Sequence, residues 1–491
     1  MQRKIRSYPR RRLYVVNALI AALVIIISVA VLETARIGVQ ISSFEIDATP
    51  VTHYTTGPGP MVVLAHGFAG SQQMMQGYAL PLARAGYNVF AFEFMGHGRH
   101  SQPMSGDVSA IEGTTRLLVA QTQRVIDAVT NDNGKTVLIG HSMATDILVR
   151  AAAERDDIGP MVLISAFSQE ITATKPLNLL LVSGAWEAGL RGFGLEAVQM
   201  ITPDASEGET LSKDGITRRA VAAPFNEHVS VLQSRVARRE TLIWLDGYFN
   251  RQSDVRILPT GWAILGLLGG LVALFYNMIS FLPAREPVAL PPSRLQMVIT
   301  LGAPVLVAPL LAVPLKPSFL PVLVADYLML HLLIFGVIQL GLLRFWRATL
   351  GRGPFGGLAM LLAFCAIFAF ALDRYAANFM PTSERLWIIA IILLGTLPYM
   401  VADTVLSTQA SLLRRACLRG GFLVSLAIAV FLDFEGLFFL IMIAPVLLLF
   451  YAVFGTIGRS AAAKSGPLPC GMALGFVLAW ALGVSFPLFQ P

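Results

Sequence analysis

Long apolar stretches constrain the fold of this chain more than any other feature. The stretch 13–32 has no charged residue, and at about 20 residues it is long enough for a helix to cross a hydrocarbon core about 30 Å thick. The sequence therefore predicts a transmembrane anchor at 13–34 and a polytopic all-α membrane domain at 256–491. The predicted spans of that domain lie near 257–282, 295–315, 322–343, 355–372, 386–406, 421–434, 436–456 and 469–489.

Two of these stretches have alternative interpretations. The first could belong to a cleaved signal peptide, whose apolar region is about 7–15 residues long and ends at a small-x-small site. Ser28-Val29-Ala30 fits such a site loosely, but the apolar stretch is too long, which favours a retained anchor. The stretch 421–434 is short, so it is either a tilted span or a re-entrant segment.

The basic residues predict the orientation of the chain. If the basic tail 1–12 is cytoplasmic, the segment 35–255 lies on the outer side and the later loops alternate between the two sides. The predicted cytoplasmic loops hold Arg285, Arg294, Arg344, Arg347, Arg352, Arg414, Arg415, Arg419, Arg459 and Lys464. The opposite loops hold Lys316, Asp373, Arg374, Glu384, Arg385, Asp433 and Glu435.

This alternation explains the net charge of +7 as a topology signal and argues against nucleic-acid binding. In a bacterial cell the protein would then lie in the inner membrane, with the segment 35–255 in the periplasm.

The segment 35–255 has the mixed composition of a soluble domain. Short apolar runs alternate with helical patterns, which predicts a mostly parallel sheet with helices on both faces. The expected strands are 61–65, 88–94, 136–140, 161–165 and 178–183. The expected helices are 74–85, 110–130, 143–155 and 229–249, the last of which leads into the membrane.

A serine follows one of these strands in the run Gly140-His141-Ser142-Met143-Ala144. A serine on a sharp turn between a strand and a helix projects its hydroxyl away from the sheet, and small residues flank it because the turn is crowded. This pattern predicts Ser142 as a nucleophile and the N–H of Met143 as a donor to a developing oxyanion. The usual pattern has Gly where this chain has Ala144.

The run His66-Gly67-Phe68-Ala69-Gly70 follows the strand 61–65 directly. Glycines let the backbone turn sharply and approach a ligand closely. One interpretation is a simple turn between a strand and a helix. The other is a second arm of an oxyanion hole, with the N–H of Phe68 as the donor.

An acid and a histidine come later in the chain. Glu187 follows the strand 178–183, where a carboxylate can orient a histidine and stabilise its charged form. Glu170 is a rival acid, and Asp204 and Asp214 are weaker rivals. His228 lies on a loop ahead of the last helix, and its neutral imidazole can take a proton from a serine and return it to a leaving group.

Together these residues resemble the α/β-hydrolase superfamily. The chain order Ser142, Glu187 and His228 is the family's order of nucleophile, acid and histidine. The run Gly96-His97-Gly98, with Glu93 where the family often has Asp, also resembles the loop after the family's fourth strand. The resemblance covers about 45–250, and a glutamate as the third member is less common in the family than an aspartate. His97 and His100 are interpreted as structural residues, with the alternative that they line the site.

The resemblance implies hydrolysis of an ester, thioester or amide through an acyl-enzyme on Ser142, without a metal or cofactor. Many members of the family insert a lid domain between the strands predicted at 161–165 and 178–183, and this interval is too short for one. The pocket is therefore open, or it is covered by the membrane domain or by the loop around Pro176.

A hydrolase held on a membrane at both ends is well placed to reach a lipid or another membrane-bound ester. The order of a leading helix, a hydrolase domain and many helices is similar in outline to the GPI inositol-deacylases, an analogy of architecture alone. The three cysteines, Cys365, Cys417 and Cys470, lack metal-ligand spacing. The oligomeric state is not predicted.

Two other classes of function compete with an enzyme. Asp326, His331 and Asp403 lie in predicted spans, where ionisable groups are expensive and often functional. They are the only support for a transport or sensing protein with a regulatory hydrolase domain, and pairing between helices is their simpler explanation. A scaffold with a degenerate hydrolase fold is the third class, and the intact set of Ser142, Glu187 and His228 argues against it.

Overall fold

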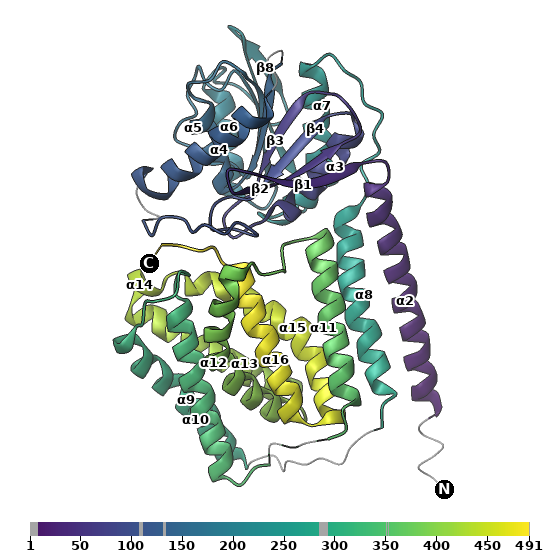
Figure 1. Cartoon of the computed structure of the whole chain (residues 1–491), viewed down its shortest axis with the longest axis vertical. Coiled ribbons are helices and arrows are strands. Elements are labelled where there is room, and N and C mark those ends of the chain that lie inside the picture. Colours follow the sequence, from purple (N-terminus) through teal and green to yellow (C-terminus); the bar gives the residue numbers. More distant parts are fainter. Residues whose placement is uncertain are drawn as a thin grey trace.

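The computed structural model describes residues 8–107, 111–130, 134–283, 293–349, 351 and 353–490. A domain built around one sheet lies at one end of a group of long helices (Figure 1). The predicted cytoplasmic residues Arg3, Lys4, Arg6, Arg285 and Arg352 lie outside the described residues.

The sheet has nine strands in the order β1-β2-β4-β3-β5-β6-β7-β9-β8. The strands from β4 to β9 in this order are parallel, and β1, β2 and β8 pair antiparallel at the two edges. The mostly parallel sheet confirms the predicted fold class. The strands are β1 (Gln40–Ile46), β2 (Thr49–Thr55), β3 (Met61–Ala65), β4 (Asn88–Phe92), β5 (Thr136–His141), β6 (Ile158–Ile164), β7 (Asn178–Gly184), β8 (Thr210–Lys213) and β9 (Ile216–Ala223).

Helices cover both faces of the sheet because successive side chains of a strand point to opposite faces. In β3, Val62 and Leu64 pack in one buried cluster with residues of α3 and α7, whereas Val63 and Ala65 pack in another with residues of α4, α5 and α6. These helices are α3 (Gln76–Arg84), α4 (Arg116–Val129), α5 (Met143–Ala152), α6 (Ala188–Gln199) and α7 (Arg235–Tyr248).

The predicted helix 229–249 is not continuous. A 3₁₀ turn, Ser230–Gln233, is followed by Ser234 in an extended conformation, and α7 begins at Arg235. The Ser234 hydroxyl accepts a hydrogen bond from the N–H of Ala237, which caps the new helix. An irregular segment, 249–259, then separates α7 from the next helix.

Nine helices of the described part are long and apolar enough to cross a membrane, which fits a helical membrane domain. We call these nine helices, together with the short helix α14, the helical domain. It consists of α2 (Tyr8–Arg36), α8 (Thr260–Ser280), α9 (Arg294–Leu315), α10 (Ala325–Phe345), α11 (Gly356–Tyr375), α12 (Ser383–Ser407), α13 (Leu412–Leu432), the short α14 (Phe434–Leu437), α15 (Leu440–Ser465) and α16 (Pro467–Ser485).

The predicted short span 421–434 is wrong in its bounds. Helix α13 begins nine residues earlier than predicted, at Leu412, and Ser411 caps it by accepting a hydrogen bond from the N–H of Arg414. Arg419, predicted in a loop, is a helical residue whose guanidinium lies 3.0 Å from the Asp403 carboxylate. An arginine with a carboxylate partner can be accommodated inside a helix bundle, so the helix extends past the apolar run.

The three polar residues predicted inside the spans have separate partners. The carboxylate of Asp326 accepts a hydrogen bond from the N–H of Leu320, and Asp403 pairs with Arg419. His331 lies within hydrogen-bonding distance of the Tyr327 and Ser425 hydroxyls. These contacts account for the polar groups as packing interactions between segments.

Helices α2 and α8 pack side by side and connect to the two ends of the sheet domain (Figure 1). A Cβ atom added at Gly266 would lie 2.5 Å from Oγ of Ser28, and one added at Gly270 would lie 2.8 Å from Cγ1 of Ile25. The spacing of Gly266 and Gly270 is that of the Gly-x-x-x-Gly motif, which lets two helices approach closely in a membrane.

We predict that Gly266→Leu separates α2 from α8, because overpacking of a close contact costs about 1–3 kcal/mol. The melting temperature of the protein in detergent should fall by several degrees. Gly269→Leu is the matched control, since a Cβ atom at Gly269 meets nothing within 4 Å. Equal effects of the two substitutions would contradict this account of the packing.

Candidate functional site

Ser142 lies on a tight turn between β5 and α5. Its backbone has φ of 54° and ψ of −120°, a conformation that L-residues rarely adopt, and its N–H donates to the carbonyl of Ile164. A Cβ atom at Gly140 would lie 2.7 Å from Leu148 and 3.1 Å from Ala144, so there is no room for a side chain beneath the turn. The crowding explains why small residues flank the serine.

The structure brings Ser142, His228 and Glu187 together. Nε2 of His228 lies 2.8 Å from Oγ of Ser142, and Nδ1 lies 2.6 Å from Oε1 of Glu187. These distances allow a hydrogen-bonded path from the carboxylate through the imidazole to the hydroxyl.

Two further groups hold the carboxylate of Glu187. The Ser165 hydroxyl and the N–H of Gly184 donate to Oε2 at 2.7 and 2.6 Å, which leaves Oε1 for His228. Ser165 follows β6 and has φ of 51°. Ser165 was not predicted from the sequence. Its partner, Glu187, follows a different strand, and only the adjacency of β6 and β7 brings the two side chains together.

The rival acids lie elsewhere. Glu170 pairs with Arg150 of α5 at 2.8 Å. Asp214 lies in the turn between β8 and β9, at the edge of the sheet, and Asp204 is exposed in the segment after α6. Of the four acids considered from the sequence, the one that contacts His228 is Glu187.

The pKa values of the pair move in opposite directions. Burial raises the pKa of Glu187, but hydrogen bonds from His228, Ser165 and Gly184 outweigh it, so that the pKa lies below its usual value. The hydrogen bond to Glu187 raises the pKa of His228, and this effect exceeds the opposing effect of burial. The protonated form of His228 is therefore stabilised by a carboxylate that stays ionised.

His141 supports His228 from the strand side. Its ring is buried, and Nε2 lies 2.7 Å from the backbone carbonyl of His228. Burial lowers the pKa of His141 to about 4, so the ring is neutral near pH 7 and donates through Nε2. His141 is the residue before Ser142. Because the motif allows any residue at this position, it does not predict the contact with His228.

The two predicted oxyanion donors flank the serine. A Cβ atom at Gly67 would lie 3.0 Å from Cβ of Ser142, so the 66–70 loop passes directly beside the serine. In the described part of the chain, the N–H groups of Phe68 and Met143 make no hydrogen bond to another protein group. Both remain available to an acceptor near the Ser142 hydroxyl.

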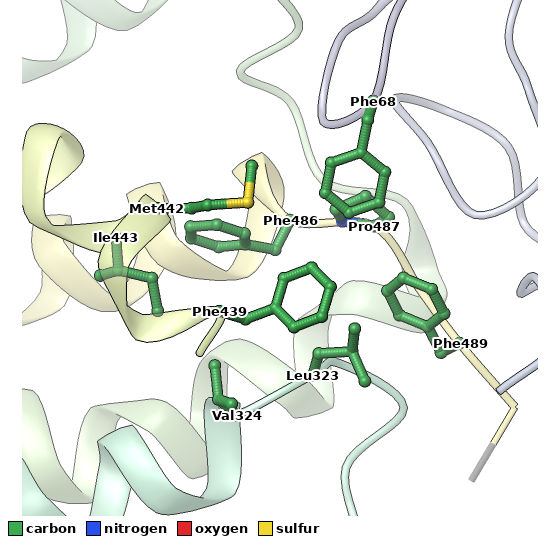
Figure 2. A pocket seen from close by; sticks show the side chains of 9 residues that line it. All are labelled: Phe68, Leu323, Val324, Phe439, Met442, Ile443, Phe486, Pro487 and Phe489. Atoms are coloured by element: carbon green, nitrogen blue, oxygen red, sulfur yellow. The ribbon is translucent and has the colours of Figure 1, made fainter. Parts of the chain in front are cut away.

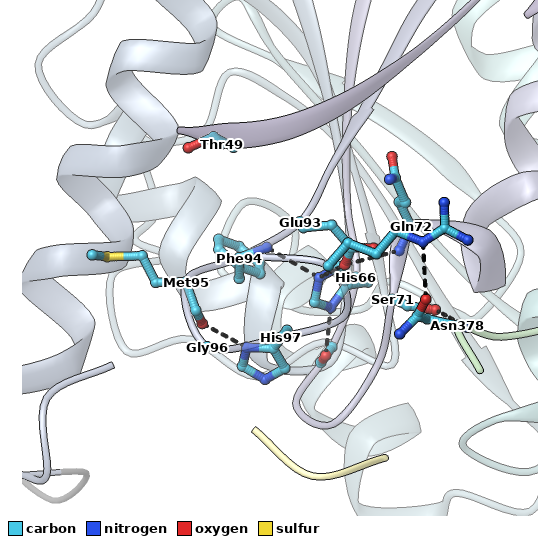
Figure 3. Close-up of polar contacts among 12 residues, drawn as sticks. Thr49, His66, Ser71, Gln72, Glu93, Phe94, Met95, Gly96, His97 and Asn378 are labelled. Carbon is cyan, nitrogen blue, oxygen red and sulfur yellow. Dashed lines mark hydrogen bonds and ion pairs between the residues drawn. The ribbon is translucent and has the colours of Figure 1, made fainter. Parts of the chain in front are cut away.

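A buried polar network lies behind the 66–70 loop (Figure 3). Nδ1 of His66 lies 2.8 Å from the Gly67 carbonyl, and its Nε2 accepts a hydrogen bond from the N–H of Phe94. Glu93 lies 3.3 Å from the same ring. His97 and His100 are also buried against backbone groups, in agreement with a structural role.

The helical domain reaches this loop region. Arg385 of α12 is fully buried and donates to the carbonyls of Gly96, Gly483 and Phe486 at 2.7–3.0 Å. It therefore joins the segment after β4 to the end of α16.

The segment 486–490 continues this contact. Leu488 exchanges backbone hydrogen bonds with Gly96 and Met104, and Gln490 donates to Met104. The rings of Phe439 and Phe489 lie 6.2 and 6.4 Å from the ring of Phe68. Phe439 and Phe489 both belong to the predicted membrane domain 256–491, so this part of the chain packs against the 66–70 loop.

The described residues hold no group of three or more His, Cys, Asp or Glu side chains placed to bind a metal ion. All three cysteines are free, with Cys365 and Cys470 buried and Cys417 exposed.

A protein-family model matches most of the sheet domain. Residues 57–241 match the family model described as serine aminopeptidase, S33. Among solved structures, the chain is similar to an epoxide hydrolase from an endophytic Streptomyces, with 15% identity over 44% of this chain and 97% of that one, at a TM-score of 0.33. It is also similar to a membrane phospholipase A described as a bacterial virulence factor, with 15% identity over 51% and 100% of the two chains, at a TM-score of 0.32.

An epoxide hydrolase from Vigna radiata is similar at 22% identity over 26% of this chain, at a TM-score of 0.22. The chain covers 41% of the length of that enzyme. No curated protein matches the chain.

We predict that Glu187→Gln lowers the pKa of His228, because the substitution removes the carboxylate that raises it. Only the neutral ring reacts with diethyl pyrocarbonate, so the pH of half-maximal modification should move to a lower value. Mass spectrometry of the peptide that contains His228 measures this midpoint.

Glu227→Gln is the matched control, because Glu227 acts on His228 only through a weaker charge interaction. It should move the midpoint less than Glu187→Gln does. An unchanged midpoint in Glu187→Gln would show that the carboxylate does not act on the ring.

Proposed function

We propose that this chain, which carries an α/β-hydrolase domain followed by apolar helices, is a membrane-embedded serine hydrolase that cleaves an ester. The observation that supports it most is the continuous contact from Glu187 through His228 to the Ser142 hydroxyl. The two unbonded N–H groups beside that hydroxyl add a site for the negative charge of an acyl-transfer intermediate.

In the proposed reaction, neutral His228 takes the proton of Ser142 while Oγ attacks the ester carbonyl. The N–H groups of Phe68 and Met143 donate to the carbonyl oxygen as it becomes negative. His228 then gives the proton to the leaving alcohol, and the acyl group remains on Ser142. A water molecule, deprotonated by His228, releases the acid and restores the serine.

Glu187 has an electrostatic role in this sequence. Its ionised carboxylate favours the imidazolium that forms in each half of the reaction, and its contact with Nδ1 keeps Nε2 directed at Ser142. Ser165 and Gly184 are positioning residues, since they hold the other carboxylate oxygen.

We also propose an orientation in the membrane. Arg344, Arg414 and Lys464 lie at helix ends that point away from the hydrolase domain (Figure 1). Basic residues accumulate on the cytoplasmic side of a membrane protein. The hydrolase domain then lies on the outer side, which is the periplasm if the protein resides in a bacterial inner membrane.

Labelling of intact membranes with a fluorophosphonate probe tests the nucleophile. Wild-type protein should be labelled, and Ser142→Ala should not. Turnover of a soluble ester should fall roughly 10³–10⁴-fold in Glu187→Gln, as expected when a histidine loses its orienting carboxylate.

Glu170→Gln is the control for the acid, because Glu170 contacts Arg150 and not His228. It should change kcat/KM by less than about twofold, as is usual for a surface substitution. Labelling that persists in Ser142→Ala would overturn the proposal. A loss in Glu170→Gln equal to that in Glu187→Gln would overturn the role of Glu187.

A further inference from the structure

A polar cleft lies where the edge of the sheet domain meets the ends of α2 and α11 (Figure 1). Its volume is about 460 Å³, and sites for small molecules usually measure about 300–1,000 Å³. Strands β1 and β2 and the 3₁₀ turn Gln72–Met75 line it from the sheet domain, and the ends of α2 and α11 line it from the helical domain. We call it the interdomain cleft.

The apolar cavity beside Phe68 and Phe439 is a separate and much smaller space (Figure 2). Its volume is about 10 Å³, and a single water molecule already needs about 10–15 Å³. It shares no lining residue with the interdomain cleft. A ligand of more than a few atoms therefore has room in the cleft and none in this cavity.

Two buried side-chain amides line the interdomain cleft without a hydrogen-bond partner. Gln72 and Gln73 are 6% and 8% exposed, and within the described residues neither side-chain amide makes a hydrogen bond. An amide offers two N–H donors and a carbonyl acceptor, and leaving these groups unbonded in a buried place costs free energy. A group bound in the cleft can supply the missing partners.

Two of the three arginines that line the cleft are neutralised by carboxylates. The ion pairs are Arg99 with Asp373, at 2.7 Å, and Arg374 with Glu33, at 2.8 Å. Their charges are therefore balanced within the protein.

The third arginine, Arg36, has no carboxylate within ion-pair distance among the described residues. Its Nη1 donates instead to the neutral side chain of Gln76, at 2.6 Å. The remaining carboxylate of the lining, Glu45, is exposed on β1, where solvent screens its charge. An anion bound beside Arg36 would therefore balance a positive charge that the protein leaves unpaired.

The arginines lie at the level where two apolar helices end. Arg36 is the last residue of α2, and Arg374 is the second-last residue of α11, and both helices are long and apolar enough to cross a membrane. Phe370, one turn before Arg374, lines the same cleft and is 61% exposed. A molecule lying along α11 thus meets an apolar surface first and positive charge at its end. This order fits a lipid with hydrocarbon chains in the bilayer and an anionic group at its surface.

We propose that the interdomain cleft binds the phosphodiester head group of a membrane phospholipid. Arg36 pairs with the phosphate, and the amides of Gln72 and Gln73 form hydrogen bonds with phosphate oxygens and head-group hydroxyls. The acyl chains lie against Phe370. Ser142 does not line the cleft, so this site is independent of the proposed hydrolysis. A bound lipid contacts both domains and therefore stabilises their junction.

The test measures lipid binding to the full-length protein in detergent by native mass spectrometry, with dioleoylphosphatidylglycerol as the probe. Wild-type protein should bind this probe roughly tenfold or more tightly than dioleoylglycerol, which has the same chains and no phosphate. Arg36→Gln should weaken binding of the probe roughly tenfold, because it removes a charged donor to the phosphate. Equal affinities of the wild type and Arg36→Gln would overturn the proposal.

Inorganic phosphate distinguishes the two sources of the same chemistry. In large excess it should leave the lipid bound, because the lipid is also held by its chains. Displacement of the probe by inorganic phosphate would show a site for the free anion and overturn the assignment to a lipid.

Gln72→Leu and Gln73→Leu separate a binding role from a structural one. Neither amide has a partner to lose in the described part of the chain, so the lipid-free variants should melt at or above the wild-type temperature. Their affinity for the probe should nevertheless fall. A lower melting temperature with unchanged affinity would overturn the role of the two amides as ligands.

Arg239→Gln is the matched control for charge, because Arg239 is exposed on α7 and does not line the cleft. It should bind the probe within about twofold of the wild type, as is usual for a surface substitution. A loss equal to that of Arg36→Gln would show a general effect of charge and would count against the cleft.

Discussion

The close packing of α2 against α8 determines the position of the sheet domain relative to the helices. The chain enters that domain from α2 and leaves it toward α8, so the two connections start from neighbouring points. In lipid, apolar side chains gain little by meeting one another, and close packing at small residues is a main source of association. Gly266 and Gly270 provide such a contact. An ion pair between Glu33 of α2 and Arg374 of α11, at 2.8 Å, ties this pair to the rest of the helices.

Buried arginines with carbonyl partners make two further connections. Arg385 links α12 to the segment after β4, and Arg238 links α7 to Gly77 and to the segment before α8. A guanidinium presents several donors in fixed directions, so one side chain can hold segments that are distant in sequence. Burial lowers the pKa of Arg238 to about 10, which still leaves it charged near neutral pH.

The sequence predicted the features that depend on local patterns. Strand and helix alternation, the turn at Ser142 and the order of Ser142, Glu187 and His228 are all visible in single runs of residues. The choice between Glu187 and Glu170 was open because both follow predicted strands, and only the spatial order of strand ends separates them. The contacts of His141 with His228 and of Ser165 with Glu187 could not be predicted for the same reason. The strands β1, β2, β8 and β9 are not predicted, because polar or charged residues interrupt their sequences.

The pairing of the 486–490 segment with Gly96 and Met104 has a consequence for biosynthesis. The ribosome makes the hydrolase domain early and this segment only after α16. Until then Phe68 lacks the ring of Phe489, and the carbonyl of Gly96 lacks the N–H of Leu488. A nascent or truncated chain can thus form the sheet and the turn at Ser142 while the surroundings of Phe68 remain incomplete. The segment that follows α16 therefore completes the surroundings of Phe68 seen in this structure.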